Sequence, residues 1–330
     1  MGAPGRYLLL GGLLGLVVLV SLCVGAHPVA PMDALRALVA PDPEALAHVV
    51  VRDLRVPRMA AAVLAGAALG VSGVLMQAVT RNPLADPGLL GVNAGAALAV
   101  VGAAWLFGVG DPRGQALAAL PGAALLAVLV YLLGSAGRQG SSPVRLALAG
   151  AACSALALAL VSAIILTNQA SLETYRFWMV GSVAGTRPDA LWSIGPLIGA
   201  GLLLALIAAR PLDALVLGDE AAQSLGTALG RLRLLCLCAV TLSCGAAVAL
   251  TGPIGFVGLV VPHLARALCG PGMMGTLCAA GLIGPIFLLT ADIAGRLLLP
   301  GGEIPAGLAA ALIGGPVFVL LVRGLERRAA

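Results

Sequence analysis

The stretch Arg81-Asn82-Pro83-Leu84-Ala85-Asp86-Pro87-Gly88 separates two apolar segments, Pro57–Val79 and Leu89–Phe107. Each segment has roughly the 20 apolar residues that a helix needs to cross a bilayer. The two prolines cannot continue a helix, and each pushes the residue before it out of helical geometry. Asp86 is placed to cap the following helix, because its carboxylate can accept hydrogen bonds from free N–H groups at the helix start. The pattern predicts two membrane-spanning helices joined by a polar turn on the cytoplasmic side, whose key residues are Arg81, Asn82, Pro83 and Asp86.

Composition extends this prediction to the whole chain. Of the 330 residues, 60% are hydrophobic and only 10% are charged, whereas a soluble domain carries about 25% charged residues. The 45 glycines and the aromatic content of 3% indicate helices that pack through small residues. We therefore predict an all-α integral membrane protein in which residues 1–330 form a single transmembrane domain.

Ten apolar segments are predicted to cross the membrane. They are Tyr7–Ala26, Pro57–Val79, Leu89–Phe107, Gln115–Gly134, Val144–Leu166, Ala190–Ala209, Leu232–Leu250, Pro253–Leu268, Thr276–Leu298 and Ile304–Val322. Met32–Ala40 is expected to be a short amphipathic helix outside the membrane, and Phe177–Gly185 is too short to cross and is expected to be re-entrant or interfacial. With the N-terminus inside, more of the arginines fall on the inner side, as the positive-inside rule requires. Both termini are then cytoplasmic.

A second polar stretch, Leu217–Gly226, interrupts the later apolar segments. Asp219 and Glu220 lie where a helix start favours negative charge, and Gly226 is placed to end the helix. A short amphipathic helix at about 217–230 on the inner face could dock into a groove of a cytoplasmic partner. The alternative is an ordinary solvated loop.

Three arginines are predicted to lie together on the outer face. Arg55 and Arg58 open the second span, and Arg296 closes the ninth span on the same side. They could receive the carboxylates of an extracytoplasmic partner through charge-assisted hydrogen bonds. The alternative is that they extend to lipid headgroups, which is the commoner fate of such residues.

A faint internal similarity links two glycine-rich stretches, Gly66–Gly73 and Gly245–Gly252. In the predicted topology the first runs inward and the second outward, as an inverted repeat requires. In a chain so rich in alanine and glycine, chance similarity is an open alternative.

Other function classes have little support. The arginines are scattered, without the basic patch of a nucleic-acid-binding protein. Cys236 and Cys238 form the closest cysteine spacing, but no His or carboxylate lies beside them to complete a metal site. No glycine-rich phosphate-binding loop is present. We expect no catalytic residue, no metal and no cofactor bound by this chain.

Two rival mechanisms stay open at this point. An intramembrane protease would need Ser72 and His263 to meet in space as nucleophile and base. An ion-driven secondary transporter would need ionisable groups at mid-membrane, for which Asp292 and Glu173 are the nearest candidates.

Five blocks of sequence, in order along the chain, resemble the FecCD/BtuC family of ABC importer permeases. They are Arg55–Arg58, Arg81–Gly91, Leu217–Glu220, Gly252–Arg266 and Glu303–Pro316. The resemblance implies ten helices per permease, two permeases per transporter, two cytoplasmic ATP-binding subunits that hold ATP and Mg²⁺, and an extracytoplasmic substrate-binding protein. It also implies a multi-pass protein in the bacterial cytoplasmic (inner) membrane, which performs no chemistry itself.

The resemblance assigns roles to the two polar sites. The residues implied to couple transport to the ATPase are Leu217, Gly218, Asp219, Glu220, Ser224, Leu225 and Gly226. Arg55, Arg58 and Arg296 match positions that receive acidic residues of the binding protein. The segments Gly91–Gly95, Ser142–Gly150 and Tyr175–Ser182 look most like ferric-siderophore permeases, the ferric enterobactin type in particular. Haem and cobalamin permeases share the framework, and a heterodimer of permeases is favoured over a homodimer.

Overall fold

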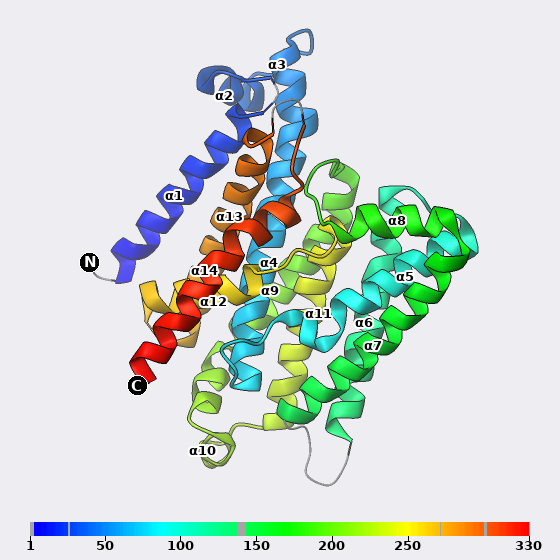
Figure 1. Ribbon diagram of the computed structural model, residues 1–330. Helices are drawn as coiled ribbons and strands as arrows, with labels where there is room; N and C mark the ends of the chain where they lie inside the picture. Colours follow the sequence, from blue (N-terminus) through cyan, green and yellow to red (C-terminus); the bar gives the residue numbers. More distant parts are fainter. Residues whose placement is uncertain (1–2, 26, 137–142, 271, 300–301, 330) are drawn as a thin grey trace.

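A computed structural model describes residues 3–25, 27–136, 143–270, 272–299 and 302–329, so that Ala26 and Ser142 of the segments above lie outside it. Within these ranges all the regular structure is helical (Figure 1). The elements are α1 (Ala3–Cys23), α2 (Pro31–Val39), α3 (Leu46–Val49), η1 (Val50–Arg55), α4 (Val56–Thr80), η2 (Pro87–Leu90), α5 (Val92–Phe107), α6 (Pro112–Ser135), α7 (Pro143–Thr167), α8 (Gln169–Met179), α9 (Pro188–Val216), α10 (Asp219–Ser224), α11 (Leu229–Thr251), α12 (Val257–Cys269), α13 (Met273–Leu297) and α14 (Ala306–Ala329).

Each predicted span falls on a helix, but the helices differ in length. Among the described residues, seven helical stretches are long and apolar enough to cross a bilayer: α1, the continuous stretch Leu46–Thr80, α6, α7, α9, α11 and α13. The apolar parts of α5, α12 and α14 are shorter. At about 1.5 Å per residue, α12 reaches only about 20 Å of the roughly 30 Å hydrocarbon core. The count of ten crossings therefore stays a prediction.

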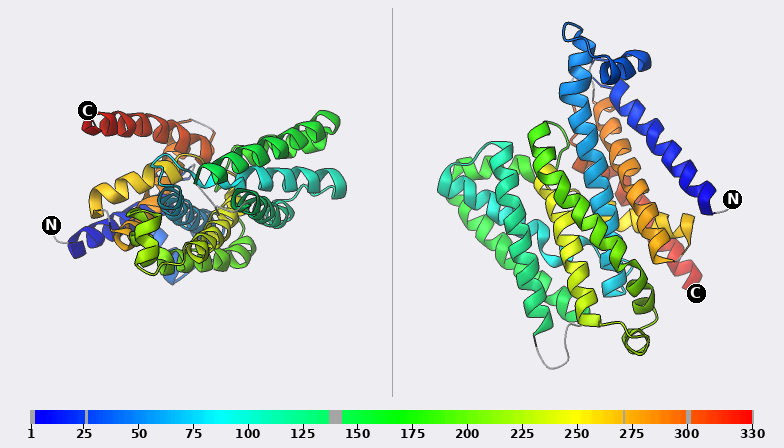
Figure 2. Two further views of the ribbon diagram at one scale, coloured as in Figure 1. Left: turned by 90° about the horizontal axis from the view of Figure 1, so that it is seen from below. Right: turned by 180° about the vertical axis from the view of Figure 1, so that it is seen from behind.

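Two of the predicted spans are interrupted near the centre of the molecule. In place of one helix from Leu89, the chain forms the short 3-10 turn η2, and α5 begins only at Val92 after Gly91, whose φ is 75°. Likewise α12 begins at Val257, not at Pro253, because the backbone between α11 and α12 adopts positive φ at Gly252 and Phe256. From these breaks α5 and α12 diverge to opposite sides of the molecule, as both views show (Figures 1 and 2).

Small residues bring the central helices into close contact. A Cβ atom built on Gly66 of α4 would lie 2.6 Å from the carbonyl of Gly284 on α13. One built on Gly73 would overlap the carbonyl of Gly258 at the start of α12. The hydroxyls of Ser72 and Ser243 form a buried 2.8 Å hydrogen bond between α4 and α11. Because neighbouring backbones touch directly, α4 is the buried centre of the bundle.

The two glycine-rich stretches of the proposed repeat occupy equivalent places. Gly66–Gly73 lies on α4 and Gly245–Gly252 at the end of α11, and these helices pack against each other and run in opposite directions (Figure 1). Each helix is followed by a break and then by a short helix. The inverted repeat stays a prediction, and this arrangement is the one it requires.

Two short segments predicted to lie outside the spans have defined structure. The predicted short amphipathic helix Met32–Ala40 is present as α2, whose own residues Ala34 and Ala37 form its buried face. The apolar Phe177–Gly185 segment is only partly helical, because α8 begins at Gln169 and ends at Met179. The Asn168 side chain caps α8 by accepting a 2.8 Å hydrogen bond from the Ser171 N–H group. A loop with positive φ at Gly181 and Gly185 follows.

Candidate functional site

The predicted cytoplasmic helix exists as α10, at the lower end of the molecule between α9 and α11 (Figure 1). It is shorter than expected and spans only Asp219–Ser224. Gly226 ends it as predicted: its φ is 84°, its N–H group donates to Gln223, and the Thr227 N–H group donates to Ala222. Of its side chains only Ala222 is buried, while Leu217 and Leu225 on either side of the helix are exposed. Such a surface is available to a partner.

Asp219 connects α10 to two other helices. Its Oδ1 atom forms an ion pair with Arg81, the residue that ends α4. Its Oδ2 atom accepts a 3.0 Å hydrogen bond from Arg233, a buried residue of α11. One carboxylate thus joins the surface helix to the ends of α4 and α11. Glu220, the neighbouring acidic residue, is exposed.

The polar turn after α4 begins at the surface and then enters the bundle. Arg81 has φ of 49°, and the Asn82 side chain accepts a 2.9 Å hydrogen bond from the Leu84 N–H group. Arg81, Asn82 and Pro83 are exposed, but Ala85 and Pro87 are buried. Only the first half of the predicted cytoplasmic turn therefore faces solvent.

Asp86 caps the following turn, as expected from the sequence. Its Oδ1 atom accepts a 2.8 Å hydrogen bond from the Gly88 N–H group at the start of η2. A Cβ atom built on Gly258, at the start of α12, would lie 2.9 Å from Oδ2. Burial raises the pKa of the Asp86 carboxyl, and the hydrogen bond from Gly88 opposes that rise. Asp86 thus places the turn against the central break between α11 and α12.

The three outer arginines lie together at the upper end, with their guanidinium groups bound inside the protein. Arg296 pairs with Asp292 on its own helix and donates 2.9 Å hydrogen bonds to the carbonyls of Ser21 and Val24. Arg55 donates to the carbonyls of Leu22, at 2.6 Å, and of His27. The last turn of a helix leaves carbonyl groups without partners. Arg55 and Arg296 therefore bind the C-terminal turn of α1.

Arg58 completes the cluster. Its Nε and Nη2 atoms bind both oxygens of Asp292, at 2.8 to 3.1 Å, and its Nη1 atom binds Glu303 at 2.6 Å. Asp292 is 0% exposed, whereas the Glu303 side chain is 43% exposed. Each of the three arginines therefore already has acceptors in this chain, and their docking role stays a prediction. A groove of about 350 Å³ adjoins them, lined in part by Asp53, Arg187 and Glu303.

Sequence reasoning missed the central place of Asp292 in this cluster. It noted Asp292 only as an ionisable group near mid-membrane, although its i,i+4 spacing to Arg296 was a usable signal for an ion pair on one helix face. The contacts of Arg58 with Asp292 and with Glu303 join positions more than 200 residues apart, and nothing local indicates them.

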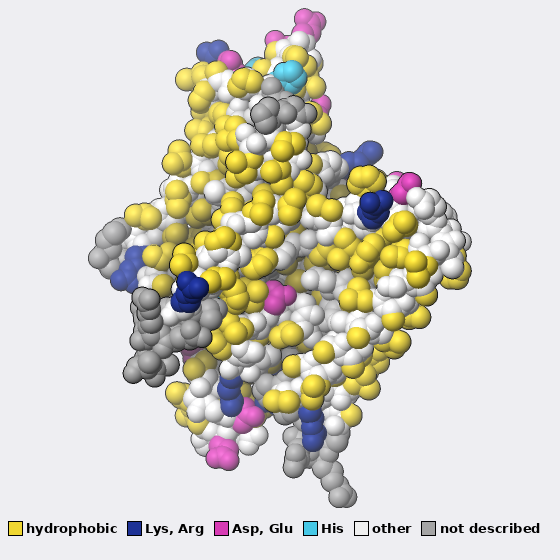
Figure 3. Space-filling view, viewed as in Figure 1, with side chains coloured by type: hydrophobic (Ala, Val, Ile, Leu, Met, Phe, Trp, Pro, Cys, Tyr) yellow, Lys and Arg dark blue, Asp and Glu magenta, His cyan; other side chains and the backbone are white. Residues whose placement is uncertain are grey.

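The two residues of the protease alternative do not form a pair. The Ser72 hydroxyl is hydrogen-bonded to Ser243, and the His263 Nδ1 atom is 2.8 Å from the carbonyl of Leu259 on its own helix. Within the described ranges, no three His, Cys, Asp or Glu side chains are grouped to hold a metal ion. Figure 3 shows a face dominated by hydrophobic side chains, with acidic groups at the upper tip and the lower end and others near the centre and at the right edge.

Sequence comparison decides which family has this architecture. The profile of the FecCD transport family matches residues 13–324. The chain belongs to the FecCD transport family. Among curated FecCD-type relatives, the ferric enterobactin transport system permease protein FepD of Escherichia coli (strain K12) is 42% identical over 329 residues, covering 98% of both chains. The probable siderophore transport system permease protein YfiZ of Bacillus subtilis (strain 168) is 38% identical, covering 84% of this chain and 83% of its own length.

A solved structure supports the same assignment. An inward-facing metal-chelate type ABC transporter superposes on this FecCD chain with a TM-score of 0.86 and 29% sequence identity, covering 97% of this chain and 99% of its own. The predicted family resemblance is therefore confirmed, and the short helices α5 and α12 belong to a fold shared with a transporter.

Proposed function

We propose that this chain is the membrane-spanning permease subunit of an ATP-driven importer of ferric siderophores in the bacterial cytoplasmic membrane, with both termini in the cytoplasm. The strongest support is that the FecCD family profile matches nearly the whole chain and that iron-siderophore permeases are among its relatives. The rising direction of α1 and the descending direction of α14 agree with termini on the side of α10 (Figure 1).

The complete transporter would contain partners that this chain lacks. A second permease subunit, favoured to be non-identical, would form the translocation path with this one. Two cytoplasmic ATP-binding subunits would hold ATP and Mg²⁺, and an extracytoplasmic binding protein would deliver the siderophore. Membrane lipid surrounds the apolar outer surface, since many large hydrophobic side chains of α6, α7 and α9 are exposed.

Asp219 offers a physical route from the ATPase to the translocation path. A partner that moves α10 would pull on Arg81 through the Asp219 carboxylate. Arg81 starts the turn that carries Asp86 to the central break before α12. Motion of a short surface helix would therefore reach the middle of the bundle through the connected segment Arg81–Asp86.

Replacing Arg81 with Gln tests this route. The Arg81–Asp219 pair is substantially exposed, so its loss should change the free energy of unfolding by less than about 1 kcal/mol. We expect the ATPase subunits to bind normally while siderophore uptake per ATP hydrolysed falls by about 5- to 150-fold, the usual range of coupling between sites. The measurement is uptake and ATP hydrolysis by the complete complex in proteoliposomes.

Glu220→Gln is the matched comparison for that experiment. Glu220 neighbours Asp219 on the surface of α10 but has no ion pair with Arg81 among the described contacts. This variant should weaken association with the ATPase subunits and leave the ratio of uptake to hydrolysis unchanged. An Arg81→Gln transporter with a normal ratio would contradict the proposed route.

Uptake by iron-starved cells tests the proposed function itself. Radio-iron bound to catecholate or hydroxamate siderophores would be supplied to cells with and without this chain, with haem and cobalamin as controls. We expect uptake of one siderophore class to be lost without the chain and restored by the wild-type sequence. Selective loss of haem or cobalamin uptake would refute the siderophore substrate and keep the ABC permease. Uptake that depends on an ion gradient and not on ATP would refute the permease itself.

A further inference from the structure

The segment between α11 and α12 contains an unusual backbone turn centred on Phe256. Phe256 has φ of 67° and ψ of −27°. The Val257 N–H group donates a 2.9 Å hydrogen bond to the Gly255 carbonyl, two residues earlier, which closes a γ-turn. A γ-turn with positive φ is rare and strained, and a bulky side chain makes it more so. The surroundings of Phe256 must therefore hold it in this conformation.

The ring of Phe256 lies against a weak point of α14. A Cβ atom built on Gly314 would lie 2.5 Å from the Phe256 Cβ and 3.1 Å from its Cγ, and one built on Gly315 would lie 3.9 Å from the end of the ring. Pro316 follows directly inside the helix. Proline removes a helical hydrogen bond and glycine resists bending least, so Gly314-Gly315-Pro316 is where α14 can kink.

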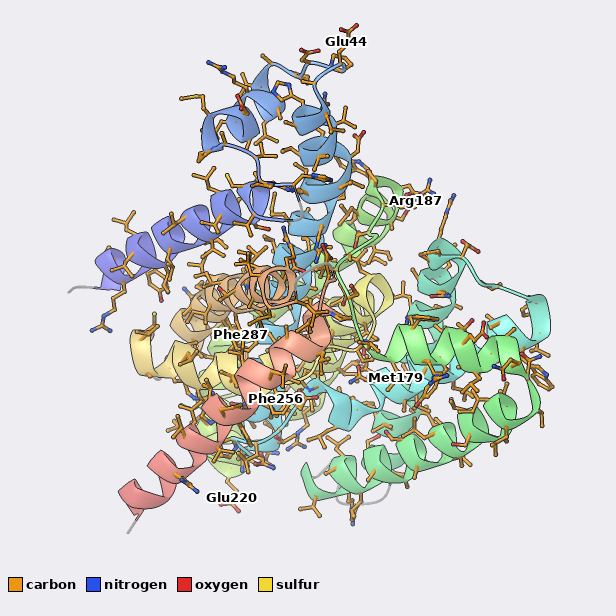
Figure 4. The ribbon with its side chains drawn as sticks, turned by 45° about the horizontal axis from the view of Figure 1, so that its top comes forward. Glu44, Met179, Arg187, Glu220, Phe256 and Phe287 are labelled. Atoms are coloured by element: carbon orange, nitrogen blue, oxygen red, sulfur yellow. The ribbon has the colours of Figure 1, made fainter. Side chains whose placement is uncertain are left out.

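Neighbouring contacts place this turn at a junction between two groups of helices. The Ser182 N–H group, just after α8, donates to Thr251 at 2.7 Å, and the Gly307 N–H group of α14 donates to Gly181 at 3.0 Å. The segment between α11 and α12 therefore contacts the loop after α8 through Thr251 and Pro253, and α14 through Phe256. Figure 4 labels Phe256 and Phe287 next to α14 and Met179 at the end of α8.

We propose that Phe256 positions α14 as the gate of the translocation path, a proposal that rests on the transport function above. With its ring on Gly314-Gly315, Phe256 holds α14 in the arrangement of this structure. When the γ-turn relaxes to negative φ, the ring leaves the glycine pair and α14 bends at Pro316. The strain makes two discrete arrangements accessible to the junction, which suits a part that must switch.

Phe256→Ala and Gly314→Ala test the gate in the complete transporter in lipid nanodiscs and proteoliposomes. The first removes the ring, and the second fills the position that the Phe256 Cβ occupies and displaces an intact ring. Both should raise the hydrogen-exchange rate of α14 amides beyond Gly314 by about two- to tenfold. This factor corresponds to the free energy of one lost aromatic contact. Exchange in α4 should stay unchanged, and both variants should let siderophore cross without ATP.

Two further variants keep the test decisive. Phe256→Gly removes the ring and adopts positive φ without strain, so that the turn survives if either alanine variant folds poorly. Phe107→Ala removes an equally large, exposed ring at the far end of α5 and should change neither exchange nor leak.

The outcomes separate the gate from the transport function. Unchanged α14 exchange in folded Phe256→Ala and Phe256→Gly proteins would overturn the gate, as would exchange that rises equally in α4, α13 and α14. A wild-type complex that transports siderophore, with variants that show no ATP-independent passage, would also overturn it. Raised α14 exchange in a complex that transports no siderophore would refute the substrate and leave the positioning role of Phe256 standing.

Discussion

Asp292→Ala is expected to be the most destabilising single change in the outer half of this protein. Asp292 is 0% exposed and is the shared counter-charge of Arg296, 2% exposed, and Arg58, 12% exposed. Removing one partner of a buried ion pair leaves an uncompensated buried charge and costs about 3–5 kcal/mol. Here Arg296 loses its only carboxylate partner among the described contacts, and Arg58 keeps only the partly exposed Glu303. Thermal unfolding of the purified protein in detergent measures the effect.

The loss of the Asp292 carboxylate should destabilise the N-terminal helix α1 first. Arg296 uses its remaining donors to bind the last turn of α1, at Ser21 and Val24, and needs Asp292 to hold it in that position. Protease cleavage between α1 and α2 should therefore increase in the variant before the rest of the protein unfolds. Asp292→Asn, which keeps an acceptor oxygen, should fall between wild type and Ala.

Asp33→Ala is the matched control. Asp33 forms a longer 3.8 Å ion pair with Arg36 on α2, and both side chains are about half exposed or more. Such a pair contributes less than about 1 kcal/mol. If Asp292→Ala unfolds at the same temperature as Asp33→Ala, the buried cluster does not stabilise the outer half as described.

Gly284→Val is expected to abolish most of the folded protein. A Cβ atom at Gly284 would overlap the carbonyl oxygen of Gly66. The helix backbone fixes the position of each of these two atoms, so no change of side-chain rotamer can relieve the overlap. α4 and α13 would have to separate along the most extensive helix contact of the molecule. Overpacking costs typically about 1–3 kcal/mol and occasionally more, and a backbone overlap lies at the upper end because no side chain can move to relieve it. Yield of monodisperse protein after membrane extraction is the measurement.

Gly281→Val is the control for that variant. Gly281 lies one turn earlier on α13, so the intrinsic effect on helix formation is the same, but the nearest atom to its Cβ would be a Val71 methyl group at 3.9 Å. This variant should give a folded yield much closer to wild type. Equal yields from the two variants would show that the contact between α4 and α13 is not the limiting one.

Local chemistry accounts for the features that were predicted correctly. Pro83 and Pro87 end a helix wherever they occur, and Asp86 caps the next turn through a bond to Gly88, two residues away. Gly226 ends α10 because it alone adopts a left-handed conformation there without strain. Each of these effects acts within a few residues and is visible in the order of amino acids. The apolar spans are visible for the same reason, since hydropathy is a property of a continuous segment.

Distant contacts decided the rest. The same hydropathy that located Leu89–Phe107 and Pro253–Leu268 could not show that each begins with a break, because both breaks are held by packing against other helices. Arg55, Arg58 and Arg296 lie together at one end of the bundle, as predicted, but whether a guanidinium group turns outward or inward depends on acceptors from other parts of the chain.

The sequence by itself determined a many-helix membrane protein, its polar turns and the end at which three of its arginines gather, since those follow from residue type and spacing; its resemblance to known sequences identified the FecCD family. Only the tertiary structure showed that Asp219 joins α10 to α4 and α11, that Asp292 unites the outer arginines, and that Phe256 is strained against α14. The physical reason is common to all three. An ion pair or a packing contact between remote residues depends on the relative placement of helices, and that placement results from the whole bundle.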